Sequence, residues 1–141
     1  MGEHVRASAS ITADGAMAAI RAGWEKSRQI GVAINISVVD GAGNEVAFLR
    51  PDGAPLLSMG IARDKAYTVA AFNGVPSHEW FPMIEGEPAL REGIVHRDRL
   101  VIFGGGVPIM VDGVLVGAVG CSGGSAEQDR EVAQAAADAV A

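Results

Sequence analysis

The sequence is poor in cysteine, aromatic residues and lysine, and it contains no long apolar run. A single cysteine, Cys121, excludes an intrachain disulfide and any zinc site built from several cysteines. No segment approaches the roughly 18 consecutive apolar residues of a membrane span, and residues 1–10 lack the apolar stretch of a secretion signal. We therefore expect a cytoplasmic protein that does not contact a membrane.

Positive charge is also scarce, with 11 lysines and arginines against 17 aspartates and glutamates, which gives a net charge of −6. A general nucleic-acid binder needs a basic face, so we expect no nucleic-acid partner. Aromatic residues make up 5% of the chain, whereas glycine occurs 19 times. The core must therefore be built from small aliphatic side chains and close backbone contacts. A length of 141 residues predicts one domain, 1–141.

Hydrophobic periodicity predicts three helices and five strands. Helices are expected over residues 12–29, 58–72 and 125–141, and strands over residues 33–39, 45–49, 99–103, 107–111 and 114–121. Thr12 or Asp14 can cap the first helix and Gly31 can end it, whereas Ser125 with Gln128 fits a capping box at the start of the last helix. Turn residues at 40–44 and at Asp112-Gly113 predict two hairpins. Strands joined by hairpins form an antiparallel sheet, so the expected fold class is α+β with helices covering the sheet.

The spacing of apolar residues also predicts which faces are buried. In the first helix, Ala16, Ile20 and Trp24 share one face. Along 33–39, apolar and polar residues alternate, which predicts a strand with Ile34, Ile36 and Val38 on one face and Asn35 and Ser37 on the other. Glycines and prolines between residues 74 and 98 predict a long irregular stretch, and long loops in compact domains are often functional.

Two glycine clusters are candidate ligand sites. One lies between a strand and a helix start and consists of Ser122, Gly123, Gly124 and Ser125. Free N–H groups and the helix dipole at such a place favour an anion, although a tight turn capped by Ser125 explains the same residues.

The other cluster includes Gly104 and Gly105, which let a flat ligand or another chain approach the backbone closely. A sharp loop between two strands is the alternative interpretation.

The three histidines, His4, His78 and His96, do not have the spacing of a zinc site. Each of them could be the axial ligand of a haem, since that role needs a single donor. Met17 and Met59 are poorer candidates for the same role. The alternative for each histidine is an ordinary exposed loop residue.

Three further charged residues are candidates for binding or catalysis. Lys65 lies in the second helix, either as a surface lysine or facing a pocket, where its ammonium would hold a carboxylate or move a proton. Arg50 suits contact with the carboxylate of a ligand. Glu127, at the start of the last helix, is a candidate for proton transfer.

Several segments together resemble the GlcG/HbpS family of small haem-binding or haem-degrading-like domains, which also occur at the C-terminus of one class of cobalamin adenosyltransferase. The segments that carry the resemblance are residues 37–44, 47–50, 52–54, 62–66, 104–109, 112–113, 116–120, 122–124 and 127–129. The resemblance implies an α-β-α layered domain with a five-stranded antiparallel sheet. It also implies homo-oligomers, up to octamers, and a ligand pocket near a subunit boundary.

The resemblance further implies that some members bind haem, through a histidine near the first helix. Residues 12–29 contain no histidine, and His4 lies upstream of them. The function that the resemblance implies is binding of haem or another tetrapyrrole, an anionic small molecule. The alternative is a cofactor-free catabolic enzyme of the isomerase, lyase or hydratase type, which acts on a small organic acid by proton transfer. In it the 122–125 turn would stabilise a carboxylate or enolate, while Lys65, His78 or Glu127 would transfer protons.

Overall fold

The computed structural model describes residues 2–141, so Met1, the first residue of the predicted domain, lies outside the described residues. The helical elements are α1 (Ala13–Ile30), α2 (Ser58–Ala71), the 3₁₀ turn η1 (Ser77–Glu79), α3 (Trp80–Ile84), α4 (Pro88–Ile94) and α5 (Ala126–Asp138). The strands are β1 (Asn35–Asp40), β2 (Glu45–Leu49), β3 (Gly106–Val111) and β4 (Val114–Ser122). No helix among these residues is long and apolar enough to cross a membrane.

The first helix confirms the end signals in the sequence. The Thr12 side chain accepts a hydrogen bond from the backbone N–H of Gly15, and Gly31 ends the helix in the left-handed conformation. The predicted buried face is only partly right, because Trp24 is 38% exposed while Ala16 and Ile20 are buried. Ala19 and Gly23 lie one turn apart on the buried face of α1, and a Cβ on Gly23 would lie 3.2 Å from Ala136, so small residues let α1 lie close to α5.

The four strands form one antiparallel sheet in the order β2-β1-β4-β3. Both predicted hairpins are confirmed, and Asp112 and Gly113 adopt the positive φ angles that a two-residue turn requires. The predicted alternation along β1 is confirmed, since Ile36 and Val38 belong to the larger core cluster and Val39 to the cluster on the opposite face. Asn35 and Ser37 are fully buried, because β1 lies in the centre of the sheet with helices over both of its faces.

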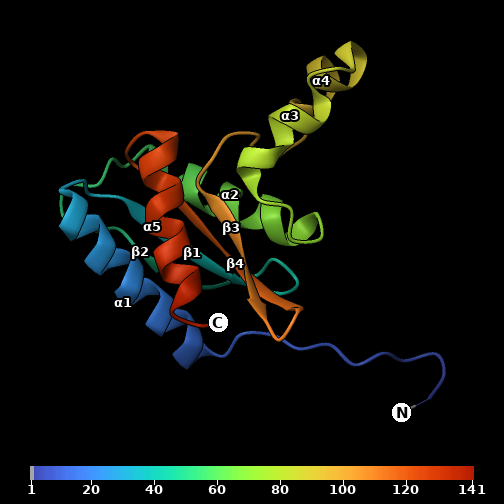
Figure 1. Cartoon of the computed structure of the whole chain (residues 1–141), viewed down its shortest axis with the longest axis horizontal. Helices are drawn as coiled ribbons and strands as arrows, with labels where there is room; N and C mark the ends of the chain where they lie inside the picture. Colours follow the sequence, from blue (N-terminus) through green and yellow to red (C-terminus); the bar gives the residue numbers. More distant parts are fainter. Residues whose placement is uncertain (1) are drawn as a thin grey trace.

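The sheet is the middle layer of an α-β-α arrangement (Figure 1). Helices α1 and α5 pack side by side on one face, where the larger hydrophobic core lies. Helix α2 covers the other face over β1, β3 and β4. The layered α+β class is confirmed.

A pair of cross-strand glycines, Gly106 of β3 and Gly120 of β4, lies beneath α2. A Cβ atom on Gly120 would collide with the backbone of Ala62 and Ala66 in the helix. These glycines therefore let the helix backbone approach the sheet closely.

The predicted fifth strand over residues 99–103 is wrong. Arg99 has a φ angle of +65°, which is incompatible with an extended strand at that residue. The segment is instead anchored to α2, because the Thr68 hydroxyl donates to the Arg99 carbonyl and accepts from the N–H of Val101. The sheet consequently has four strands.

The predicted irregular stretch is also wrong in part, because η1, α3 and α4 lie within it. Helices α3 and α4 form an arm that projects from the body of the molecule (Figure 1). Buried Trp80 packs against Phe72 at the root of the arm, with ring centroids 4.7 Å apart. Phe81 and Met83 of the arm are exposed.

Candidate functional site around His78

His78 lies in η1, where the root of the arm is fixed to the sheet. The hydroxyl of the preceding residue, Ser77, accepts a hydrogen bond of 2.8 Å from the backbone N–H of Gly106 in β3. The His78 side chain is partly buried, and its Nδ1 atom has no hydrogen-bond partner among residues 2–141. The Ser77 hydrogen bond thus holds the backbone at His78 against β3, whereas Nδ1 of the imidazole forms no hydrogen bond with residues 2–141.

Two hollows flank His78. The larger, of about 340 Å³, lies between η1, β3 and the C-terminal half of α5, and its lining includes Pro108 and Met110. The smaller, of about 240 Å³, is lined by His78, Gly104, Ala126, Glu127 and Arg130. The structure therefore brings together three residues that the sequence pointed to separately, His78, Gly104 and Glu127.

At this site the His78 imidazole is neutral, and the Arg130 guanidinium has no ion-pair partner in the described chain. Burial and the nearby Arg130 guanidinium lower the pKa of His78 below its ordinary value, although the Glu79 carboxylate opposes this. The imidazole is therefore neutral near pH 7, which is the form that ligates metals. Within residues 2–141, no carboxylate forms an ion pair with Arg130.

Lys65 is neither a surface lysine nor a pocket residue with a free ammonium. Its side chain is 1% exposed, and Nζ donates to the carbonyl of Cys121 at 2.9 Å and to Oδ2 of Asp129 at 3.0 Å. Gly105 makes room for it, since a Cβ there would lie 2.6 Å from Nζ. The pair joins α2 and α5, which cover opposite faces of the sheet.

The glycine turn between β4 and α5 is occupied by side chains of this chain. Oδ1 of Asp129 accepts from the N–H of Gly124 at 2.9 Å, and the Gln128 side chain accepts from the N–H of Ser125. The Ser125 hydroxyl completes the predicted capping box by accepting from the N–H of Gln128. An external anion at the 122–125 turn would have to displace Asp129 and Gln128.

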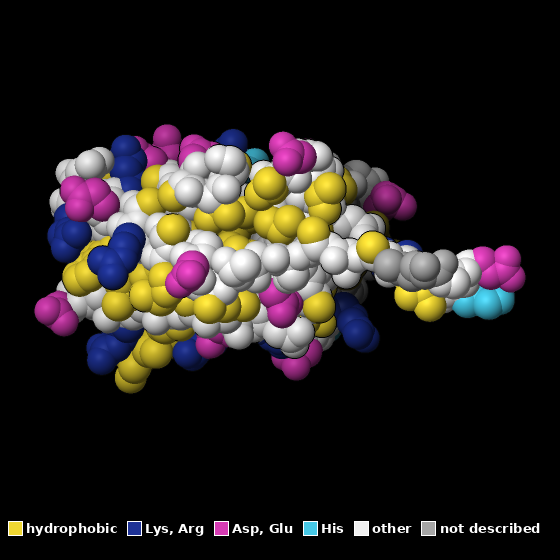
Figure 2. All heavy atoms as spheres, turned by 90° about the horizontal axis from the view of Figure 1, so that it is seen from below, with side chains coloured by type: hydrophobic (Ala, Val, Ile, Leu, Met, Phe, Trp, Pro, Cys, Tyr) yellow, Lys and Arg dark blue, Asp and Glu magenta, His cyan; other side chains and the backbone are white. Residues whose placement is uncertain are grey.

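The remaining predicted ligands lie elsewhere. His4 is exposed and pairs with Glu3 in the N-terminal segment, which projects from the body (Figure 2). His96 is exposed after α4, and Arg50 is exposed after β2. None of these three residues lines the hollows beside His78.

The sulfur-containing candidates are not placed at the site either. Met17 is 47% exposed on α1, and Met59 is partly buried in α2. Cys121 is buried, and burial together with the Asp129 carboxylate raises the pKa of its thiol. Cys121 is therefore not a thiolate ligand. Among residues 2–141 there is also no group of three or more histidine, cysteine, aspartate or glutamate side chains that could hold a metal ion.

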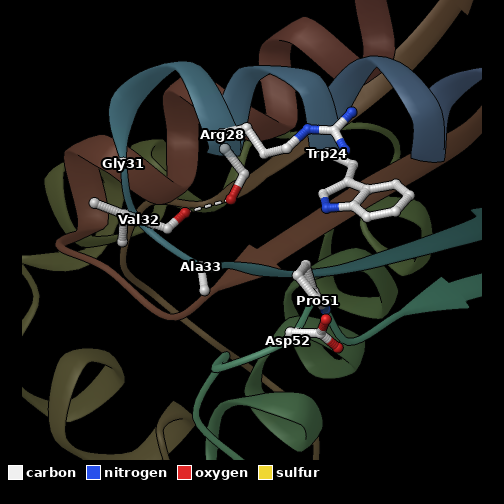
Figure 3. A pocket seen from close by; sticks show the side chains of 8 residues that line it. Trp24, Arg28, Gly31, Val32, Ala33, Pro51 and Asp52 are labelled. Atoms are coloured by element: carbon white, nitrogen blue, oxygen red, sulfur yellow. Dashed lines mark hydrogen bonds between the residues drawn. The ribbon is translucent and has the colours of Figure 1, made fainter.

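A third groove, of about 330 Å³, lies between the end of α1 and the turn after β2 (Figure 3). Arg28 covers the ring of Trp24 at 4.3 Å from its centroid, and Pro51 and Asp52 form the opposite wall (Figure 3). No histidine, methionine or cysteine lines this groove, so it lacks a donor for a haem iron.

Two residues of the site region, Asp129 and Arg130, were not recognised from the sequence as site residues. Both lie in the first two turns of α5, where the sequence indicates for Asp129 only a negative charge that interacts favourably with the helix dipole. The order Asp-Arg carries no motif of its own. Only the packing of α5 on β3 and β4 brings Asp129 to Lys65 and places Arg130 beside His78.

Comparison with known proteins identifies the family. The family model described as "Haem degrading protein HbpS-like" matches residues 11–138. The chain belongs to the HbpS-like family. An uncharacterized 15.0 kDa protein in the dhaT-dhaS intergenic region of Citrobacter freundii is 37% identical to this HbpS-like chain over 131 residues, which are 92% of each protein.

Solved structures agree with this assignment. The crystal structure of Klebsiella pneumoniae protein ORFY matches this HbpS-like chain with a TM-score of 0.88 and 32% identity, covering 99% of this chain and 96% of ORFY. A crystal structure of a PduOC–haem complex matches with a TM-score of 0.83 and 33% identity, covering 92% of this chain and 94% of PduOC. None of these relatives is named as an isomerase, lyase or hydratase, so the proton-transferring enzyme gains no support.

Proposed function

We propose that this HbpS-like chain binds haem or a related tetrapyrrole in the hollows beside His78, with His78 as the axial ligand. The observation that carries the proposal is a neutral imidazole, fixed by η1 and left without a partner on Nδ1, between two hollows. The similarity to a protein crystallised with haem supports the choice of ligand.

The residues around His78 fit the two kinds of surface that haem presents. Val107, Pro108 and Met110 offer an apolar wall for the macrocycle. The guanidinium of Arg130 can donate two parallel hydrogen bonds to a propionate carboxylate. Bound haem would supply a redox-active iron, whereas the chain itself positions the ring and holds its charged edge.

A hemin titration followed by the Soret band tests this proposal. His78→Ala is expected to weaken hemin binding at least about tenfold, equivalent to about 1.4 kcal/mol, because the axial donor is removed. His4→Ala and His96→Ala are matched controls that should leave the titration unchanged, since both side chains are exposed and outside the hollows. An unaltered Soret shift in His78→Ala, or its loss in His4→Ala, would refute the assignment of His78.

We also propose that the chain self-associates, as the resemblance implies. Large apolar side chains are exposed at two separate places, Leu56 and Leu57 before α2 and Phe81 and Met83 on the arm. Exposed apolar patches of this kind mark interaction surfaces. Light scattering at micromolar concentration should give a mass at least twice 14.5 kDa, and a monomer mass would contradict the expectation.

A further inference from the structure

A cleft of about 330 Å³ lies between α2 and the root of the arm. Tyr67, Phe72, Trp80 and Leu100 contribute apolar or aromatic surface to its lining. None of its lining residues also lines the hollows beside His78, so it is a separate cavity. Its volume lies in the range that small-molecule sites occupy.

Polar groups without partners accompany this aromatic surface. Trp80 is 4% exposed, and its Nε1 has no acceptor among residues 2–141. A buried N–H without an acceptor is costly, so native structures rarely leave one unpaired. Arg97 and Asp98 also line the cleft; both are exposed, and neither forms an ion pair within the described chain.

The neighbouring arginine differs from Arg97. Arg99 pairs with Asp64 at 3.2 Å, and its guanidinium stacks on Tyr67 at 3.9 Å from the ring centroid. It therefore forms part of the wall and keeps the Tyr67 ring in place. Arg97 alone supplies a cation that is free to meet a ligand.

We infer that this cleft is a second binding site, which takes a planar aromatic anion such as an aromatic carboxylate or sulfonate. The aromatic side chains Tyr67, Phe72 and Trp80 favour a flat ring, because stacked and edge-to-face contacts add to the burial of apolar area. Arg97 binds the acidic group at the rim, since a guanidinium matches a carboxylate or sulfonate with two donors. The site does not depend on haem binding.

The test uses 8-anilinonaphthalene-1-sulfonate as the anionic probe and N-phenyl-1-naphthylamine as its uncharged counterpart. Fluorescence titration of the full chain should show saturable binding of one anionic probe per chain. Ala71→Phe fills the cleft from an exposed position on α2 and should weaken both probes at least about tenfold. Arg97→Gln should weaken only the anionic probe, about tenfold. Val5→Ser, an exposed residue of the N-terminal segment outside the cleft, is the control and should change neither.

Other outcomes would overturn the inference. Undiminished probe binding in Ala71→Phe would show that the dye lies elsewhere, and equal losses of both probes in Arg97→Gln would remove the role of the cation. If the wild-type chain does not bind the anionic probe and Ala71→Phe dissociates an oligomer, a second copy of the chain fills the cleft. The hemin titration separates the two proposals. Ala71→Phe should leave the Soret shift intact, and its loss would show that haem occupies this cleft.

Discussion

Lys65→Met is expected to lower the free energy of unfolding by about 3–5 kcal/mol, because removal of one member of a buried ion pair leaves the other charge uncompensated. Asp129 would remain 3% exposed, with the N–H of Gly124 as its main partner. Chemical denaturation of wild type and variant measures the difference. Lys26→Met is the matched control, since Lys26 pairs with Glu131 at the surface, and it should cost less than about 1 kcal/mol.

The loss in Lys65→Met should also depend on pH. Burial raises the pKa of the Asp129 carboxyl, and the Gly124 N–H and the Lys65 ammonium oppose that rise, so removing the ammonium raises it further. A carboxyl with a raised pKa is most favourable to folding below the ordinary value of about 3.9, and this contribution is lost as the pH rises through the folded-state pKa. The deficit against wild type should therefore grow from pH 4 to pH 8.

A double variant tests whether the uncompensated charge of Asp129 causes the loss of stability. Lys65→Met combined with Asp129→Asn keeps an acceptor for the Gly124 N–H and removes both charges, so it should recover part of the stability lost in Lys65→Met. Equal stability of wild type and Lys65→Met at pH 8 would contradict the buried pair. So would a double variant that is no more stable than the single one.

Gly120→Ala is the other substitution with a large expected effect. The added methyl group would meet the backbone of Ala62 and Ala66, which cannot turn aside as a flexible side chain can. Helix α2 would have to move away from the sheet. Overpacking commonly costs about 1–3 kcal/mol, and we expect a loss of at least about 3 kcal/mol here because the obstacle is backbone. Thermal unfolding or chemical denaturation measures it.

Gly60→Ala provides the opposite result in the same helix. No atom lies within 4 Å of a Cβ built on Gly60, so alanine fits without strain. Alanine is a better helix former than glycine, and the variant should gain about 0.5–1 kcal/mol. If Gly120→Ala were as stable as Gly60→Ala, the close approach of α2 to β4 described above would be wrong.

The parts of the fold that local chemistry determines were predictable. Thr12 and Gly31 mark the ends of α1, and the Asp112-Gly113 turn joins β3 to β4. Residues 99–103 resemble a strand in sequence because the apolar run 100–103 follows Arg99 and its side chains suit a strand. Tertiary hydrogen bonds to Thr68 and the left-handed backbone of Arg99 decide otherwise, and neither leaves a mark in the local sequence pattern.

The candidate site was predictable as a set of residue types but not as an arrangement. His78, Gly104 and Glu127 were each recognised from the sequence, yet their proximity depends on how the arm root packs against α5. Lys65 was ambiguous because a lone lysine on an apolar helix face looks the same whether it is exposed or buried. Its partner Asp129 is 64 residues away in the sequence, and only the fold brings them together.

The four-stranded sheet leaves β3 as an edge strand, and that position explains why Pro108 can stand in the middle of it. Proline cannot donate a backbone hydrogen bond, so strands confine it largely to edges. A strand flanked on both sides, as β3 would be if residues 99–103 formed a strand beside it, would accommodate Pro108 poorly. The same residue interrupts the row of donors that a foreign strand could pair with, and such interruptions protect proteins from edge-to-edge aggregation. The outer edge of β3 is therefore a poor template for β-aggregation.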